Sequence, residues 1–254
     1  MSNWIGLFTL IRREFKRTMM TINQVIWPPV IITLLFLFIF GVSLGSRIKS
    51  LGGVPYVDFL LPGLVMMNVI ASSYEESASS LFQQRFMASI QEILIAPLSY
   101  MEFLVGFLAG SVLRGLVIGN LVMLIGLFAA RTVPHDWPLY LFFSVVTAVL
   151  FSAVGVIAGL LAKTFDNLAV VTTFFITPLT YVGGVFSSIH LLPPLLRQIA
   201  LFNPMLYMID GLRFSYTRSA DVSVAIDATV ATALALLALF IAYSMTKRGV
   251  NLRV

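Results

Sequence analysis

Long apolar runs alternate with short polar segments along most of the chain. A helix needs about 20 apolar residues to cross the hydrocarbon of a bilayer. Runs of about this length predict six membrane-spanning helices, at residues 25–44, 58–80, 103–130, 138–161, 168–186 and 224–245. Pro28 and Pro29 fall in the first turn of the first predicted span, where the N–H group that proline lacks would have no helical partner.

The stretch 82–98, after the second predicted span, interrupts this alternation. Its apolar residues Phe82, Phe86, Ile90 and Ile93 recur at steps of four and three, and polar residues fill much of the rest. Such spacing places the apolar side chains on one face of a helix. Because spans flank the stretch on both sides, we expect a short amphipathic helix that lies along the membrane surface.

Residues 1–22 predict a second surface helix. Its apolar side would carry Trp4, Leu7, Phe8, Ile11 and Phe15. Its basic side would carry Arg12, Arg13, Lys16 and Arg17. A basic amphipathic helix with a tryptophan near its start is typical of the headgroup region, where anionic lipids attract it. An ordinary cytosolic flank of the first span would carry the same charges, so both interpretations stay open here.

The segment 187–222 is apolar but repeatedly interrupted. The pairs Pro193-Pro194 and Asn203-Pro204 divide it into short apolar pieces. Pieces of roughly a dozen residues are too short to cross the hydrocarbon. They are also too apolar for a free loop. The segment therefore predicts re-entrant or interfacial helices.

Composition agrees with a membrane protein. Hydrophobic residues make up 59% of the 254 residues and charged residues 11%, whereas soluble domains carry about a quarter charged residues. The predicted fold class is an all-α membrane protein with a single transmembrane domain over residues 1–254. The chain has no cysteine, which excludes disulfides and cysteine-based metal or catalytic sites.

Six spans place both termini on one side of the membrane. Seven basic residues lie near the two ends of the chain: Arg12, Arg13, Lys16, Arg17, Lys247, Arg248 and Arg253. Basic residues concentrate in cytoplasmic segments, so we predict a multi-pass protein with both termini in the cytoplasm. The stretch 82–98 then faces the cytoplasm, and 187–222 faces outward. The same rule accounts for the net charge of +5 without a nucleic-acid partner.

Glu75 and Glu76, near the end of the second predicted span, and Arg114, inside the third, are charged residues in an apolar setting. An arginine at the bilayer centre costs roughly 2.5–3.5 kcal/mol on insertion scales, so it usually faces a partner or water. Adjacent helical residues point about 100° apart, so at most one glutamate would face the interior. We expect either an intramembrane ion pair or a lining of a transport pathway, with headgroup-level glutamates as the plain alternative.

Motifs along the chain resemble those of one protein family. After the second span comes the pattern F-x-x-x-F-x-x-x-I-x-E-x-L and then a proline, formed by Phe82, Phe86, Ile90, Glu92, Leu94 and Pro97. Three further motifs are TPLTYVGGVF with Gly183 and Gly184, LLPP with Pro193 and Pro194, and NPMLYMIDGLR with Asn203, Pro204, Tyr207 and Arg213. Together they resemble the permease subunits of ABC-2 type exporters, most closely small bacterial permeases grouped with polysaccharide, nodulation-factor and drug exporters. The resemblance covers essentially the whole chain, although the proline lies one residue earlier than in the loosest family pattern.

The resemblance implies a permease subunit of an ATP-driven exporter in the bacterial inner membrane. Two copies, as a homodimer or with a paralogue, would form the translocation pathway within the membrane lipids. A separate ATPase subunit would hold ATP and Mg, because this sequence contains no G-x-x-x-x-G-K-[ST] phosphate-binding loop. The chain itself would then bind no cofactor and would not be an enzyme.

The resemblance also implies roles for particular residues. The coupling helix of the family, which docks in the ATPase, corresponds to 82–98, with contacts from Phe82, Arg85, Phe86, Glu92, Leu94 and Pro97. The helix over 1–22 would be a second docking element. The outer-face helices that close the pathway would include Gly183, Gly184, Pro193, Pro194, Asn203, Pro204, Tyr207 and Arg213.

Two other classes of function stay open on the residues alone. An ion-coupled carrier or channel would use Glu75, Glu76 and Arg114, although the two halves of the chain show no repeat of the kind common in carriers. An integral-membrane lipid-modifying enzyme would need an acid–base or metal cluster, and two isolated histidines supply neither. Sugar chains, lipids and drugs all pass through relatives with similar spans, so the resemblance assigns no substrate.

Overall fold

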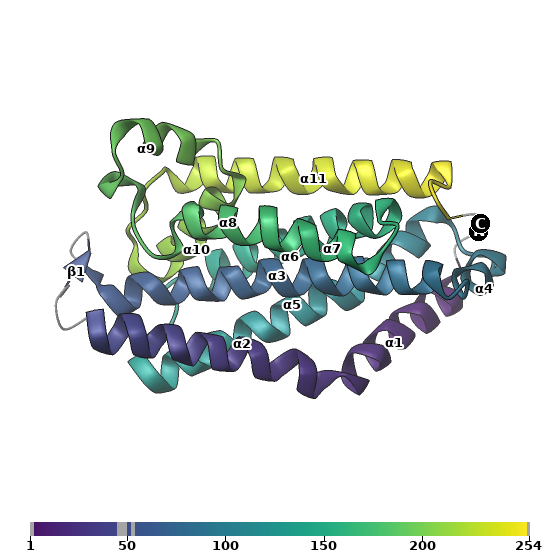
Figure 1. Cartoon of the computed structure of the whole chain (residues 1–254), viewed down its shortest axis with the longest axis horizontal. Helices are drawn as coiled ribbons and strands as arrows, with labels where there is room; N and C mark the ends of the chain where they lie inside the picture. Colours follow the sequence, from purple (N-terminus) through teal and green to yellow (C-terminus); the bar gives the residue numbers. More distant parts are fainter. Residues whose placement is uncertain (1–2, 45–49, 52–53, 253–254) are drawn as a thin grey trace.

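The computed structural model describes residues 3–44, 50–51 and 54–252, which form a bundle of helices along one long axis (Figure 1). Six helical segments in this part of the chain are long and apolar enough to cross a membrane. The predicted all-α membrane fold is thereby confirmed. Part of the polar loop after the first span lies outside the described residues, as does Arg253.

The six segments overlap the six predicted spans, and most are longer. The first span comprises α2 (Ile22–Phe36) and the π-helical η1 (Leu37–Leu44), and the second is α3 (Tyr56–Phe86). The third, fourth and sixth are α5 (Tyr100–Ala130), α6 (Trp137–Leu161) and α11 (Val224–Arg248). The fifth is the series α7 (Phe165–Val171), η2 (Thr172–Ile176), α8 (Thr177–Thr180) and η3 (Tyr181–Val185). At about 1.5 Å per residue, the 31 residues of α3 exceed a hydrocarbon layer of about 30 Å.

Helix α3 is the centre of the bundle. It packs along α5 on one side and α6 on the other, and most of its side chains are buried. The buried set includes small polar residues, among them Ser73 and Ser77, which are fully enclosed. Small side chains allow helix backbones to approach closely in a membrane, where burial of apolar surface alone gives little driving force.

Glycine on the neighbouring helices makes this close approach possible. A Cβ atom at Gly155 of α6 would overlap the hydroxyl of Ser77 and the carbonyl oxygen of Tyr74. A Cβ atom at Gly115 of α5 would overlap the hydroxyl of Ser73 in the same way. The contacts of α3 with its two main neighbours therefore require glycine at these positions.

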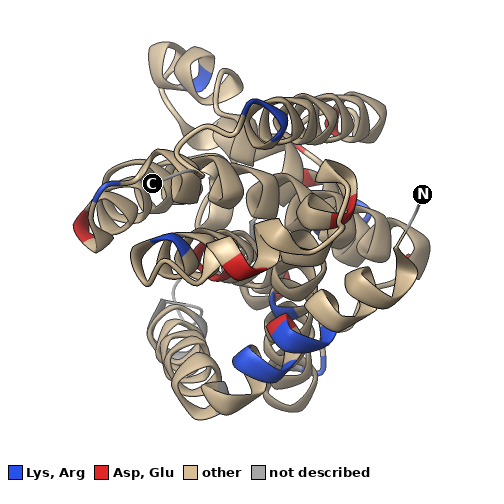
Figure 2. Cartoon of the chain, turned by 90° about the vertical axis from the view of Figure 1, so that its right-hand side faces the viewer, with Lys and Arg blue, Asp and Glu red and all other residues tan. Residues whose placement is uncertain are grey.

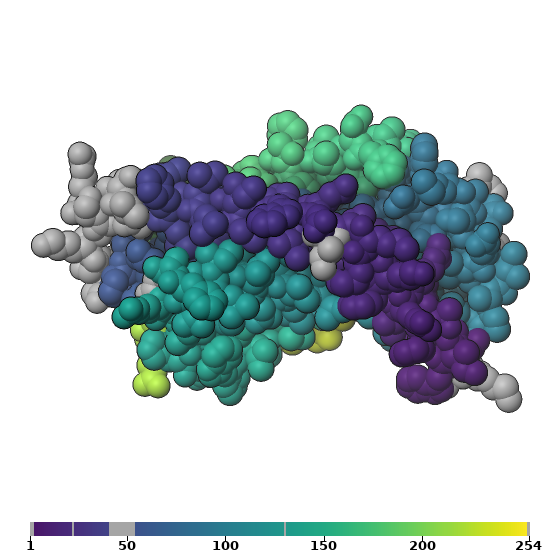
Figure 3. Space-filling view, turned by 90° about the horizontal axis from the view of Figure 1, so that it is seen from below, coloured from purple at the N-terminus to yellow at the C-terminus, as the bar shows by residue number. Residues whose placement is uncertain are grey.

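Helix α1 (Trp4–Met20) has three faces, where the sequence predicted two. Apolar residues such as Trp4 and Phe8 are exposed, as are basic residues such as Arg12. A third stripe of Leu10, Glu14 and Thr18 is buried. This stripe lies against α5, so α1 is packed onto the bundle and turns at its end into α2 (Figure 3).

The helix expected over 82–98 is divided into two. Its first residues belong to the end of α3, and only Ile90–Ile95 form a separate short helix, α4. Between them Ala88 has a φ of 56°, which an α-helix does not accommodate. The helical spacing of apolar residues continues across the break because both pieces bury side chains under the same end of the bundle. Ala96 precedes Pro97 and is extended, which ends α4 as the proline predicts.

The segment after the fifth span contains two further helices, α9 (Pro194–Leu201) and α10 (Pro204–Thr217), after a 3-10 turn at Ile189–Leu191. Each helix starts with a proline in its first turn, as the proline pairs suggest. Helix α10 is buried between α3, α6 and α11, whereas the side chains of α9 are mostly exposed.

The two ends of the bundle carry different elements. The start of α1, the short α4 and the end of α11 lie at one end, called the α4 end below (Figures 1 and 2). The opposite end carries α9 and a two-residue strand pair, β1 (Ser50–Leu51) with β2 (Val54–Pro55). Six spans require that the chain starts and finishes at the same end, and it does.

Substitution of Gly155 by alanine should destabilise the bundle, because the added methyl group meets the backbone of α3. Overpacking of this kind costs roughly 1–3 kcal/mol, which would lower the midpoint of thermal unfolding in detergent. Val145→Leu, which adds bulk on an exposed position of the same helix, should leave the midpoint unchanged. Equal midpoints for Gly155→Ala and the unaltered protein would contradict the close packing of α3 and α6.

Candidate functional site

The residues predicted to form the coupling contact are partly exposed and partly structural. Phe82 is buried, and its ring lies 4.6 Å from that of Phe165. Arg85 donates hydrogen bonds to the carbonyl oxygens of Gly159 at 2.6 Å and Asn251 at 2.7 Å. Phe82 and Arg85 therefore attach the end of α3 to α6, α7 and the C-terminal turn.

The exposed residues at this end form an apolar surface. Phe86 is 69% exposed and Ile95 is 84% exposed, and Met87 and Leu94 lie open beside them. We call Phe86, Met87, Leu94 and Ile95 the end surface. Glu92 and Pro97 are exposed nearby. The sequence pattern identified Phe86 and Leu94 but missed Met87 and Ile95, because these two do not fit the spacing of one continuous helix.

A basic groove lies next to the end surface, between α1 and the end of α3. Its volume is about 700 Å³. Its basic lining residues are Arg12, Arg13, Lys16 and Arg17, all from α1. The opposite wall includes Gln84, which accepts hydrogen bonds from Arg13 at 2.6 Å and from the hydroxyl of Ser89 at 2.8 Å. The basic side of α1 thus faces the turn between α3 and α4.

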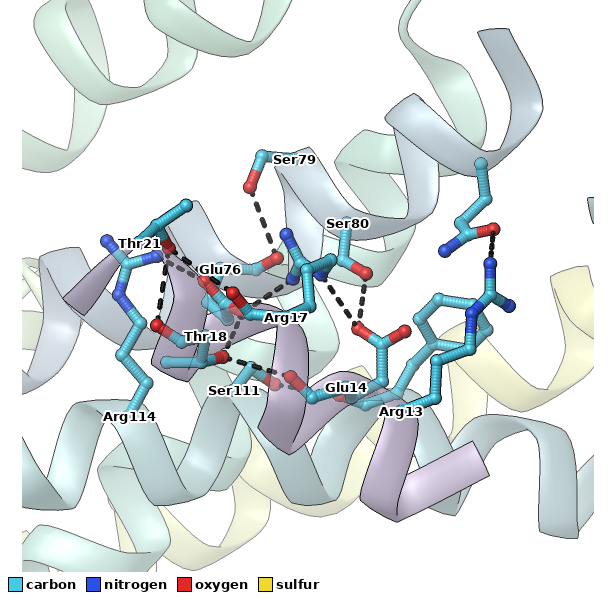
Figure 4. A network of polar contacts seen from close by, with 12 residues as sticks. Arg13, Glu14, Arg17, Thr18, Thr21, Glu76, Ser79, Ser80, Ser111 and Arg114 are labelled. Carbon is cyan, nitrogen blue, oxygen red and sulfur yellow. Dashed lines mark hydrogen bonds and ion pairs between the residues drawn. The ribbon is translucent and has the colours of Figure 1, made fainter. Parts of the chain in front are cut away.

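Glu76 joins three helices through its carboxylate (Figure 4). It is 2% exposed and pairs with Arg114 of α5. Its other oxygen accepts hydrogen bonds from Arg17 at 2.5 Å and from the hydroxyl of Thr18 at 2.6 Å, both on α1. The structure therefore brings Glu76 and Arg114 together, and it adds α1 to their interaction.

Glu14 is a second buried carboxylate in this network, and sequence reasoning missed it. It is 1% exposed, lies 3.3 Å from Arg17 and accepts a hydrogen bond from Ser80 at 2.5 Å. In the sequence, Glu14 stands among four basic residues and three positions before Arg17, and this placement could have indicated an ion pair within the helix. Two carboxylates and two guanidinium groups thus balance in charge, which buried charges require.

Glu75 lies outside this network. Its side chain is exposed on the surface of the bundle, because it precedes Glu76 by one position and so points away from α1. Only one of the two adjacent glutamates faces the interior, as the helical geometry predicts.

Arg213 is the corresponding buried charge near the other end. It is 2% exposed, and its guanidinium lies 3.8 Å from the centre of the Phe59 ring. It donates to the carbonyl oxygen of Gly184 and lies 3.5 Å from Asp210. Gly184 has a φ of 93°, a conformation that favours glycine, and this turns its carbonyl towards the arginine at the end of the fifth span.

The carboxylate of Asp210 links Arg213 to the segment before α11. It accepts the backbone N–H groups of Asp221 at 3.0 Å and Val222 at 2.8 Å. Burial raises the pKa of Asp210 above its ordinary value, while these N–H groups and Arg213 act in the opposite direction. The carboxylate of Asp221 in turn accepts the N–H of Ile189 at 2.9 Å. Helix α10 is thereby tied to the turns on both sides of it.

The remaining polar residues of the outer-face motif cap α10 or connect it to neighbouring segments by hydrogen bonds. Asn203 caps α10 by accepting the N–H of Met205 at 3.0 Å, and its amide donates to Leu179 at 2.6 Å. The hydroxyl of Tyr207 donates to the carbonyl oxygen of Leu201 at 2.6 Å. Gly183 is buried against α10. Pro193 and Pro194 are exposed at the start of α9 and lie apart from Arg213.

The described residues contain no cluster of three or more histidine, cysteine, aspartate or glutamate side chains that could hold a metal ion. The carboxylates of Glu14, Glu76 and Asp210 are instead paired with Arg17, Arg114 and Arg213, whereas the buried carboxylate of Asp227 on α11 has no hydrogen-bond partner among the described residues. These pairs therefore connect helices, whereas the end surface and the basic groove are open to another molecule.

Comparison with known proteins identifies similar chains. Residues 6–217 match the family described as ABC-2 type transporter. The chain is 40% identical over 250 residues to the inner membrane transport permease YadH of Escherichia coli (strain K12), covering 98% of both chains. It is 24% identical over 216 residues to nodulation protein J of Sinorhizobium fredii, covering 84% of this chain and 81% of the relative. It is 25% identical over 219 residues to nodulation protein J of Rhizobium leguminosarum bv. viciae, covering 83% and 81%.

Replacement of Glu76 by glutamine should strongly destabilise the protein, because Arg114 would lose its counter-charge and Glu14 would be the single carboxylate left to balance two guanidinium groups. Breaking a buried pair by removing one partner costs roughly 3–5 kcal/mol. The neighbouring Glu75→Gln substitution is the matched control and should change stability little. Thermal unfolding of both purified variants in detergent tests this expectation. A similar loss for both would show that the exposed carboxylate matters as much as the buried one.

Replacement of Arg213 by lysine should loosen α10. An ammonium group cannot stack on the Phe59 ring and at the same time reach the carbonyl oxygens of Gly184 and Phe59, as the guanidinium does. Weakening a buried, hydrogen-bonded charge costs on the order of 2 kcal/mol or more. Hydrogen exchange should accelerate in α10 and at the end of the fifth span. Arg197→Lys on exposed α9 should leave exchange unchanged, and unaltered exchange in Arg213→Lys would contradict the role assigned to Arg213.

Proposed function

The chain belongs to the ABC-2 type transporter family, and from this premise we propose that it is the permease subunit of an ATP-driven exporter. It is a multi-pass transport permease, and its similarity to an inner membrane permease supports the bacterial inner membrane as its location. In the proposed complex a separate ATPase subunit binds the α4 end, which lies in the cytoplasm together with both termini.

The apolar end surface carries this proposal. Ile95 and Phe86 are large, strongly exposed hydrophobic side chains at an end of the bundle, beyond the middle of the spans. Apolar groups that would otherwise face water mark a site of protein interaction. They lie on the short segment that the family resemblance assigns to coupling. We therefore place the ATPase contact on Phe86, Met87, Leu94 and Ile95, with Glu92 at its edge.

The basic groove supports a second contact beside the first. It adjoins the end surface and carries basic residues of α1, including Arg12 and Lys16. An acidic segment of the ATPase would complement this charge and would orient the subunit on the permease. Helix α1 then acts as the second docking element.

The Glu76 network supports a mechanical route from the docked ATPase to the spans. A displacement of α1 moves Arg17 and Thr18, and these hold Glu76 on α3 and through it Arg114 on α5. Separation of these charges in a buried site is expensive. The three helices therefore move as one unit when the ATPase closes on the α4 end.

The transport pathway in this proposal lies between two copies of the chain. The interior of the described bundle is filled by fully buried side chains, with α3 enclosed on most sides. The first and fifth spans are less enclosed than α3, as are the third and sixth, and the first and fifth lie together, with the ring of Phe186 5.2 Å from those of Phe36 and Phe40. Their exposed faces are the surface that a second copy would cover.

Two observations argue against the alternative functions. Glu76 and Arg114 neutralise each other, so they do not form the free charge that an ion-coupled carrier would use. The described residues contain no metal-binding cluster of the kind that a metal-dependent lipid-modifying enzyme would need.

Ile95→Glu is the sharpest test of the ATPase contact. The substitution places a charge in the end surface, so binding of the partner ATPase subunit should weaken at least tenfold. Co-purification and ATP hydrolysis by the complex measure the effect. Leu195→Glu, on α9 at the opposite end, replaces a leucine that is 70% exposed and is the matched control. Full binding by Ile95→Glu would show that the ATPase docks elsewhere.

A further inference from the structure

An apolar groove runs along the side of the bundle between α5, α6 and α11. Its volume is about 750 Å³. Its lining includes Leu104, Leu108 and Val112 of α5, Val149 of α6, and Leu239 and Phe240 of α11. These residues belong to the half of each span that leads to the α4 end. The groove therefore faces the hydrocarbon of the leaflet at that end.

A more polar pocket of about 660 Å³ lies at the α4 end of the same helices. Its walls include Gln91 and Ile95 of α4, Tyr100 of α5 and, from α11, Thr246, Lys247 and Arg248. Lys247 and Arg248 are exposed, and neither forms an ion pair within the described part of the chain. None of the described lining residues is acidic, so the pocket carries two uncompensated positive charges.

The groove and the pocket adjoin each other along both helices. Tyr243 lines the groove and Thr246 lines the pocket, three positions further along α11. On α5 the adjacent residues Met101 and Tyr100 make the same transition. Residues three apart on a helix lie one above the other, about 4.5 Å along its axis. An apolar hollow thus ends directly at a cationic one, at the level where α11 leaves the hydrocarbon.

We propose that the groove and the pocket together form a binding site for one anionic phospholipid of the leaflet at the α4 end. An acyl chain lies in the groove against α5 and α11. The phosphate of the headgroup lies in the pocket, where Lys247 and Arg248 donate hydrogen bonds to it. Exposed basic residues at a span end also set topology, but topology alone requires neither a pocket nor an adjoining groove.

The headgroup in this site contacts α4 directly, through Gln91 and Ile95. A bound headgroup therefore affects the end surface, of which Ile95 is a part. Its effect on ATPase binding rests on the ATPase contact proposed above. Lipid binding itself does not depend on that contact. It is measured on the permease without any ATPase, so a failure of one proposal is separate from a failure of the other.

The first experiment compares phosphatidylglycerol with phosphatidylcholine of identical acyl chains, each titrated onto the purified full chain and followed by native mass spectrometry. Each basic residue near an anionic headgroup strengthens binding by about fivefold. The unaltered chain should therefore bind phosphatidylglycerol on the order of 20-fold more tightly. Lys247→Gln with Arg248→Gln should remove this preference. Arg12→Gln with Lys16→Gln removes two charges from the basic groove at the same end and should retain it.

The second experiment fills the groove. Val105 is partly exposed and lines the groove, so Val105→Trp should weaken binding of both lipids by about the same factor. Leu124→Trp adds similar bulk to an exposed position on the same helix and is the matched control. Both tryptophans are placed on exposed positions, and the midpoint of thermal unfolding verifies that each variant is folded.

Three results would overturn the proposal. The first is equal affinity of the unaltered chain for the two lipids. The second is loss of the preference in Arg12→Gln with Lys16→Gln, which would assign the anion to the basic groove. The third concerns the groove variant Val105→Trp and the pocket variant Lys247→Gln with Arg248→Gln. If these variants bind lipid normally but change the oligomeric state or the binding of the ATPase, a protein fills this site.

Discussion

The burial of Glu76 constrains the arrangement of three helices. A carboxylate that is 2% exposed stays charged only with cationic and hydrogen-bonding partners, and here Arg17, Thr18 and Arg114 supply them. The partners come from α1 and α5, whereas Glu76 belongs to α3. None of these helices can shift alone without leaving a buried charge uncompensated. The amphipathic α1 is therefore a fixed part of the bundle, although its sequence is that of a helix resting on a membrane surface.

Helix α3 extends this constraint over the length of the molecule. At the α4 end Arg85 ties it to α6 and the C-terminal turn, and at the other end the carbonyl oxygen of Phe59 lies 3.4 Å from Arg213. Its glycine-lined contacts with α5 and α6 leave no free space for it to bend. One rigid helix thus contacts the network near the end surface and the charge cluster beside α10. In the proposed complex, α3 connects the ATPase contact to the helices that the family resemblance places at the outer face.

Charges that lack a partner stand out against this background. The carboxylates of Glu14, Glu76 and Asp210 lie beside guanidinium groups inside the bundle, whereas Lys247 and Arg248 lie open at the mouth of an apolar groove. Paired charges hold helices together, and unpaired ones attract ligands of the opposite sign. The distinction separates the structural charges of this permease from those that we assign to a lipid headgroup.

The number and approximate position of the spans follow from the sequence alone, because an apolar run of about 20 residues is compatible with few structures other than a membrane helix. The sequence also predicts that only one of the two adjacent glutamates faces inward. Tertiary structure decided that this is Glu76, that Glu14 is buried with it, and that the helix after α3 breaks at Ala88. Periodicity describes how side chains point around one helix. Which face is covered, and by which charges, depends on helices that are distant in sequence, and no local pattern contains that information.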